Sequence, residues 1–180
     1  MLKYKLRIIT VFLTFSVIVL QTSGCGQSKS ASSLENVPIA TSSSEISSEA
    51  FSFDSGKAVF TPGSDPAEAL SAQGEAQNTF TAKSCALPGD DTVYTYSGFS
   101  VSVNTDEAGK SLVTDVLLTD DSHTTAEGAY IGLSASDTKK LYGAPIESGD
   151  SYIYTKGRTE LIFIIERDSV ASIEYRLIGG

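Results

Sequence analysis

The chain has 180 residues, of which 41% are hydrophobic and 19% charged, so it is long and apolar enough to bury a hydrophobic core. Its net charge is −9, and loss of Lys3, Lys5 and Arg7 with an export signal would take it to −12. A surface this acidic repels phosphate groups, which excludes nucleic acid as a partner. The sequence also lacks the glycine-rich loops that bind nucleotides.

Residues 1–24 have the three parts of a bacterial export signal. Three basic residues lie among the first seven, and residues 8–20 are uncharged, mostly apolar and shorter than the ~20 residues that span a bilayer. The small residues Ser23 and Gly24 then precede Cys25. This ending resembles the bacterial lipobox, which implies a lipoprotein with fatty acyl chains such as palmitate on Cys25. The alternative is an ordinary secretory signal in which Cys25 is a stray thiol.

Residues 25–50 are predicted to form a disordered tether, because they are rich in serine and their few apolar residues follow no helical or strand period. The lipid would therefore hold a folded region at the outer side of the cell membrane, at the end of a flexible linker. If Cys25 is acylated, Cys85 has no partner within the chain, and we expect it to be a small buried side chain. A Cys25–Cys85 disulfide requires that the lipobox resemblance be false.

Turn residues divide the region beyond residue 50 into short elements. Residues 51–122 are predicted to contain a helix that Ser64 or Asp65 caps and Gly74 ends. The strands expected here are 57–60, 79–86, 92–96, 99–104 and 112–119. Residues 123–180 are predicted to contain a second helix, which Ser134 caps and Gly143 ends. The strands expected there are 151–155, 160–166 and 169–177.

Glycine and tyrosine matches recur in the same order in both segments. Gly63 and Gly74 correspond to Gly132 and Gly143, and two Tyr-x-Tyr strands correspond to each other further on. We therefore predict an α+β fold in which two tandem repeats, 51–122 and 123–180, each pack a helix on an antiparallel β-meander and together form one small domain.

Side-chain alternation indicates that helices cover one face of the sheet and solvent the other. One predicted set of inward residues is Phe99, Val101 and Val103. Another is Ala171, Ile173, Tyr175 and Leu177. Residues 161–165 are apolar throughout, which predicts a central strand.

The order of these elements resembles the repeat of the β-lactamase inhibitor protein and of the BamE (SmpA/OmlA) lipoproteins. Residues 128–177 carry the better match, with Ser134 before the helix, Gly143 and Pro145 after it, and then three strands. The resemblance implies a fold that holds protein partners on an open sheet face without catalysis. It also implies the alternative function of inhibiting a secreted enzyme of the β-lactamase or protease type.

Catalytic and metal-binding motifs are not evident, so we expect no enzyme activity, no cofactor and no metal. His123 is the one histidine, and its neighbours Asp120 and Asp121 fit a solvated loop better than a cation site. A hydrolase using carboxylates such as Asp115 or Glu174 is a weaker hypothesis, since any acidic domain contains such pairs.

Four tyrosines are the one group of residues in the sequence that suggests a binding surface. They are Tyr94, Tyr96, Tyr152 and Tyr154. If exposed, they would make a rigid contact patch for a protein or a cell-wall component; the competing interpretation is that they belong to the core. The function predicted from the sequence is a non-catalytic, membrane-anchored lipoprotein that binds such a partner through a sheet face.

Overall fold

A computed structural model describes residues 50–179. The export signal, the Cys25 acylation site and nearly all of the tether, residues 25–49, lie outside this range. The described residues form two helices, α1 (Ala67–Gln73) and α2 (Ala135–Tyr142), and neither is long and apolar enough to cross a membrane. The strands are β1 (Phe53–Asp54), β2 (Val59–Phe60), β3 (Asn78–Lys83), β4 (Asp90–Thr95), β5 (Phe99–Thr105), β6 (Ser111–Leu118), β7 (Ile146–Ser148), β8 (Ser151–Lys156), β9 (Thr159–Glu166) and β10 (Ser169–Leu177).

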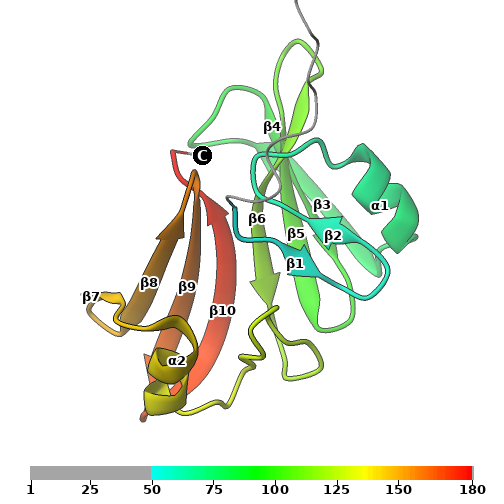
Figure 1. Ribbon diagram of the computed structural model, residues 1–180. Coiled ribbons are helices and arrows are strands. Elements are labelled where there is room, and N and C mark those ends of the chain that lie inside the picture. The colour runs from blue at the N-terminus through cyan, green and yellow to red at the C-terminus, as the bar shows by residue number, and fades with distance from the viewer. Residues whose placement is uncertain (1–49, 180) are drawn as a thin grey trace, which may run out of the picture. The chain divides into compact units, whose positions relative to one another are not determined.

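One antiparallel sheet dominates the fold. Its eight strands lie in the order β3-β4-β5-β6-β10-β9-β8-β7, and β1 and β2 form a separate two-stranded hairpin (Figure 1). Strands β6 and β10 pair with each other, which makes the sheet continuous across the middle. The prediction of an α+β fold built from two helix-on-meander repeats is therefore wrong: the fold is mostly β, and a single sheet runs through both predicted segments.

The helices are too small to cover the sheet, which is the physical reason for this correction. Helix α1 has seven residues and none is buried, because Leu70 is its only large apolar side chain. Helix α2 has eight residues, of which Ala135 and Thr138 are buried. Ser134 caps α2 as predicted, since its hydroxyl accepts a hydrogen bond from the amide of Asp137.

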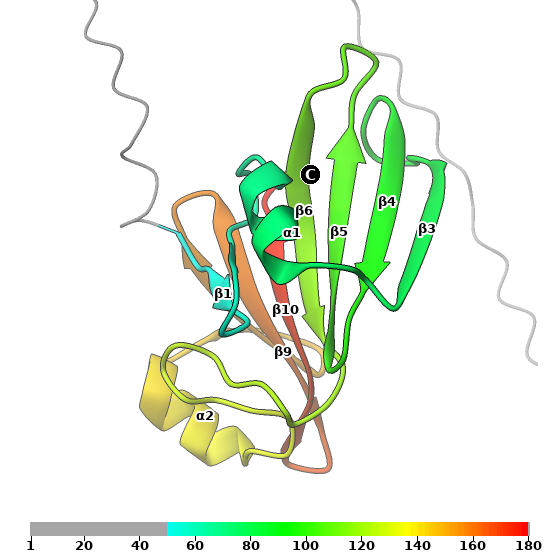
Figure 2. The ribbon, with the colours of Figure 1, turned by 90° about the vertical axis from the view of Figure 1, so that its right-hand side faces the viewer.

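The β1–β2 hairpin supplies the cover that the sequence assigned to helices. Phe53 and Phe60 are fully buried, and the Phe53 ring lies 4.9 Å from the ring of Phe99 on β5. Figures 1 and 2 show the hairpin and both helices on the same side of the sheet. We call this side the covered face. Its core also contains Val101, Val103, Val116, Leu161, Phe163, Ile173 and Tyr175.

Strand alternation was predicted correctly for β5 and in part for β10. Phe99, Val101 and Val103 are all buried. A β-bulge between Val170 and Ser172 shifts the register of β10, so Ala171 is exposed and does not share the buried side of Ile173. A bulge adds a residue to one strand, and simple alternation from sequence does not detect it.

Candidate functional site

The side of the sheet opposite the hairpin and helices, which we call the open face, carries a row of polar side chains at its centre. The strand register places Asp115 on β6 directly opposite Ser102 on β5 and Arg176 on β10, and Arg176 opposite Glu160 on β9. Because side chains alternate, these residues point away from the buried neighbours that flank them in each strand. Glu174, two residues before Arg176, points to the same face.

Arg176 lies between three carboxyl groups. Its Nη2 donates to Oε2 of Glu160 at 2.7 Å, and its Nη1 lies 3.8 Å from Oε1 of Glu174. The hydrogen bond to Glu160 is the main cause that raises the pKa of Arg176 above its usual value. Since Arg176 and Glu160 are both partly exposed, this ion pair orients the guanidinium more than it stabilises the fold.

Asp115 is the most perturbed carboxyl group of the face. Burial is the largest cause that raises the pKa of Asp115, the nearby Glu174 adds to the rise and Arg176 opposes it, and together they place this pKa at about 8. Its Oδ2 is enclosed and has no hydrogen-bond partner among the described residues. Asp115 therefore carries a proton near neutral pH, so its carboxyl group can donate a hydrogen bond as well as accept one.

A shallow groove of about 340 Å³ runs from this row toward the loop between β3 and β4. Its lining combines apolar and polar side chains from the loop and from four strands. They include Leu87, Val93, Asp91, Ser102, Asp115 and Arg176. Asp91 accepts a hydrogen bond from Asn104 at 2.8 Å, which fixes one wall. A groove with apolar walls and paired donors and acceptors suits a neutral polar group or a cation.

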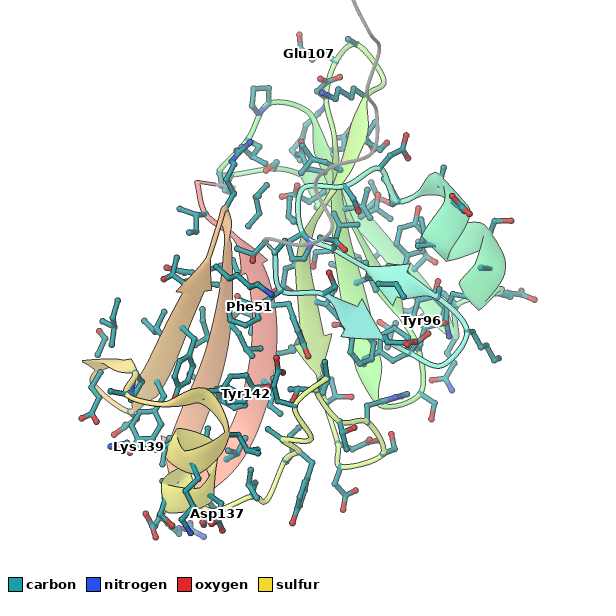
Figure 3. The ribbon with its side chains drawn as sticks, in the orientation of Figure 1. Phe51, Tyr96, Glu107, Asp137, Lys139 and Tyr142 are labelled. Atoms are coloured by element: carbon teal, nitrogen blue, oxygen red, sulfur yellow. The ribbon has the colours of Figure 1, made fainter. Side chains whose placement is uncertain are left out.

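The four tyrosines of the sequence analysis lie on the covered face. Tyr96 and Tyr154 are buried, and Tyr94 and Tyr152 are partly buried against the same core. Figure 3 shows Tyr96 on this side and Tyr142 of α2 directed toward the sheet. The ring of Tyr142 lies 5.1 Å from that of Tyr154. This placement favours the interpretation of the four tyrosines as core side chains.

The side chain of Lys139 covers part of the Tyr152 ring. The ammonium of Lys139 on α2 lies 4.5 Å from the centre of the Tyr152 ring, and it also donates to Glu147 at 2.6 Å. The hydroxyl of Tyr154 donates to the carbonyl of Gly143, just beyond α2. These contacts tie α2 to β8 and give two of the tyrosines a structural role.

Cys85 differs from its predicted position. It is a free thiol exposed in the loop between β3 and β4, so the expectation of a small buried side chain is wrong. The loop leaves the sheet after Lys83, and the side chain has no layer above it to pack against. Position in a turn, rather than residue type, decides its exposure.

His123 packs as an aromatic ring in the covered face. It lies edge-on to Phe53 and Phe99, with ring centres 5.5 and 5.1 Å apart, and its Nε2 lies 3.1 Å from the carbonyl oxygen of Ser97. Asp120 accepts hydrogen bonds from Ser122 in the same loop. These contacts secure the loop against the β4–β5 turn.

Asp115 and Glu174 were named from the sequence only as examples of acidic residues. Their approach and the position of Arg176 depend on the pairing of β6 with β10, which joins residues about sixty positions apart. Alternation in β10 does place Glu174 and Arg176 on one face. The sequence contains no signal for their neighbour across the strands.

Comparison with known proteins supplies little further evidence. No protein-family model matches the sequence, and no curated protein is recognisably similar to it. A solved structure of an extracellular protein containing a SCP domain from Bacillus anthracis str. Ames aligns with 66% of this chain and 44% of its own, with a TM-score of 0.39 and 13% identity. A likeness this distant supports no conclusion about fold or function.

Proposed function

We propose that this chain is a non-catalytic, extracytoplasmic lipoprotein that binds a protein or another component of the cell envelope through the open face of its sheet. The observation that carries the proposal is the open face itself. In residues 50–179, both helices and the β1–β2 hairpin lie on the covered side, while the other side presents a polar row beside a groove.

Large apolar side chains flank the polar row and support a contact role. Phe80 on β3 is 63% exposed, and the register places it beside Val93 on the open face. Ile146 on β7 is 64% exposed and lies in line with Ile153 and Ile162 on the same face. Large exposed apolar side chains close to polar groups are typical of protein interfaces.

Charge indicates what kind of partner this face would bind. It presents Asp91, Asp115, Glu160 and Glu174 beside Arg176. The excess of carboxyl groups favours a partner with basic or neutral polar groups, and it opposes binding to anionic lipids. A partner's amide or amine would donate a hydrogen bond to Glu174, and the protonated carboxyl group of Asp115 would donate one to an acceptor of the partner.

The proposal of a lipid anchor rests on the resemblance of residues 22–25 to the lipobox. The tether would set how far the folded region extends from the membrane. A serine-rich flexible chain of this length has a mean end-to-end distance of about 25–30 Å. The folded region would then search a volume close to the membrane, which raises the effective concentration of an envelope partner.

Anchoring is tested by mass spectrometry of the native chain from its own cells. We expect an N-terminus at Cys25 that carries fatty acid, and a Cys25→Ser chain that is released from the membrane fraction. An intact Met1, or a Cys25 without fatty acid, would contradict this part of the proposal.

Binding is tested by photocrosslinking in cells. A photoreactive phenylalanine analogue at Thr95 or at Ile146 lies on the open face, and the same analogue at Glu68 of α1 lies on the covered side. We expect adducts of one common mass from Thr95 and Ile146 and none from Glu68. The proposal fails if neither open-face position forms an adduct, or if Glu68 forms the same adduct equally well.

A further inference from the structure

Among residues 50–179, the edge of the sheet at β3 is regular and uncovered. All six residues of Asn78–Lys83 are exposed, and within the described chain β3 pairs only with β4, without a register shift. The opposite edge, β7, has only three residues. A long, straight edge strand offers unpaired backbone groups to another strand, whereas a short one does not.

The free backbone groups of β3 can be assigned from its ladder with β4. The amide of Ser84 donates to the carbonyl of Gly89, which continues the register one step beyond the strand. Because hydrogen-bonded and non-hydrogen-bonded pairs alternate, the even-numbered residues of β3 bond to β4. The N–H and C=O groups of Thr79, Thr81 and Lys83 therefore point outward, away from the sheet.

Most of the features that normally protect an edge strand are missing from β3. The strand contains no proline and no bulge. Its one charge, Lys83, lies 2.9 Å from Asp90, so the edge is close to neutral in a strongly acidic chain. Two threonines and a phenylalanine at its centre favour strand pairing.

We infer that β3 is a dimerisation edge, on which the β3 strand of a second copy of this chain pairs in antiparallel fashion about a two-fold axis at Phe80. A two-fold axis perpendicular to the sheet keeps each side chain on its own face. Phe80 of one copy then lies opposite Phe80 of the other on the open face. Thr79 of each copy lies opposite Thr81 of the other, and their outward backbone groups form the hydrogen bonds.

Two features select a second copy over an unrelated strand. The axis at Phe80 pairs the exposed aromatic rings in a non-hydrogen-bonded position, where cross-strand side chains are closest. The local pairing of Lys83 with Asp90 removes the like-charge repulsion that two copies would meet elsewhere on their acidic surfaces.

One strand edge is a small interface. It buries less than the roughly 1,200 Å² of a stable complex, so the dimer should be weak for molecules free in solution. Chains confined to one membrane surface are more concentrated, which favours pairing. The inference depends on the backbone geometry of β3; it shares the exposed Phe80 ring with the proposed open-face contact, and its crosslinking test is read from the register of β3 alone.

Disulfide crosslinking in cells tests both the pairing and its register. The full-length chain carries Cys85→Ser in all variants, to remove the exposed native thiol. Phe80→Cys is the test variant, because the paired Cα atoms would be about 4.5 Å apart, within the range of a disulfide. Thr81→Cys is the matched control, since it lies on the same strand but opposite Thr79 of the other copy.

We expect mild oxidation to shift most of the Phe80→Cys chain to twice its mass on a non-reducing gel, while Thr81→Cys stays at the level of the Cys85→Ser parent. Three results would overturn the inference. These are no dimer above the parent level from Phe80→Cys, an equal dimer from Thr81→Cys, or an adduct of a different mass, which would show another occupant of the edge.

Discussion

Replacing Asp115 by asparagine should remove a large part of the dependence of folding stability on pH. In the native chain, burial and the Glu174 charge hold the pKa of Asp115 at about 8, against 3.8 for a free side chain. Between these two values the folded state binds one proton more than the unfolded state. Stability from this group is therefore complete below about pH 4, and it is lost as pH rises toward 8 and beyond.

The size of the effect follows from the two pKa values. Each tenfold change in proton affinity corresponds to about 1.4 kcal/mol, which sets an upper limit of about 6 kcal/mol for the loss above pH 8. Because solvent reaches Glu174 and Arg176, screening makes the real loss of stability smaller than this limit, and we expect a loss of about 2–3 kcal/mol. Asparagine matches the shape of the protonated acid and can donate to Glu174, but it cannot ionise.

Urea unfolding at pH 3.5, 6 and 9 measures the difference. Asp115→Asn and wild type should agree within about 0.5 kcal/mol at pH 3.5, where Asp115 is protonated in both folded and unfolded chains, and the variant should be more stable by about 2–3 kcal/mol at pH 9. Asp137→Asn provides a control of opposite sign, because hydrogen bonds from Lys140 and Ser134 lower the pKa of Asp137. Its stabilisation is present above the unfolded pKa and is lost as pH falls. If the stability of Asp115→Asn and of wild type changed with pH in parallel, the raised pKa of Asp115 would be refuted.

Three further predictions concern the covered face and its turns. Gly98→Ala should lower the free energy of unfolding by about 1–3 kcal/mol more than Gly109→Ala does. Both glycines have φ near +80°, but only at Gly98 would the added methyl group overlap the hydroxyl of Ser122. Equal losses of stability in thermal unfolding would show that backbone strain alone matters. Phe60→Ala should lower the free energy of unfolding by about 3–5 kcal/mol, because Phe60 is fully buried in the hairpin that covers the sheet. A decrease of less than about 1 kcal/mol in urea unfolding would show that the hairpin is not part of the core. Ser134→Ala should lower the free energy of unfolding by about 1 kcal/mol because it removes the hydroxyl that caps α2, whereas Ser134→Thr keeps a capping hydroxyl. Similar unfolding midpoints for the two variants would argue against a stabilising cap.

The local elements of this chain were largely predictable from its sequence. Ser134 and Gly143 bound α2 as expected, because a cap hydroxyl and a glycine with φ of +82° satisfy helix ends through neighbouring residues alone. Alternation along β5 predicted its buried side, and residues 161–165 do lie in an interior strand, β9. Such features depend on contacts within a few residues, which a single sequence contains.

The layers of the fold were not predictable in the same way. The sequence of residues 53–60 does not distinguish a hairpin that covers the sheet from an ordinary turn. In the structure, however, Phe53 and Phe60 of this hairpin are fully buried in the core. The sequence indicated two helix-covered meanders because each helix precedes a run of strands. Which element covers a sheet depends on the apolar area that each one offers, and α1 offers too little to do so.

The sequence by itself determined the acidic charge, the signal-like start with its small residues before Cys25, and the limits of most strands and helices. Only the tertiary structure decided that Asp115 meets Glu174 and Arg176. That contact requires β6 to pair with β10 although α2 and strands β7 to β9 lie between them in the chain, and the free energy of such a pairing depends on the whole sheet rather than on either strand.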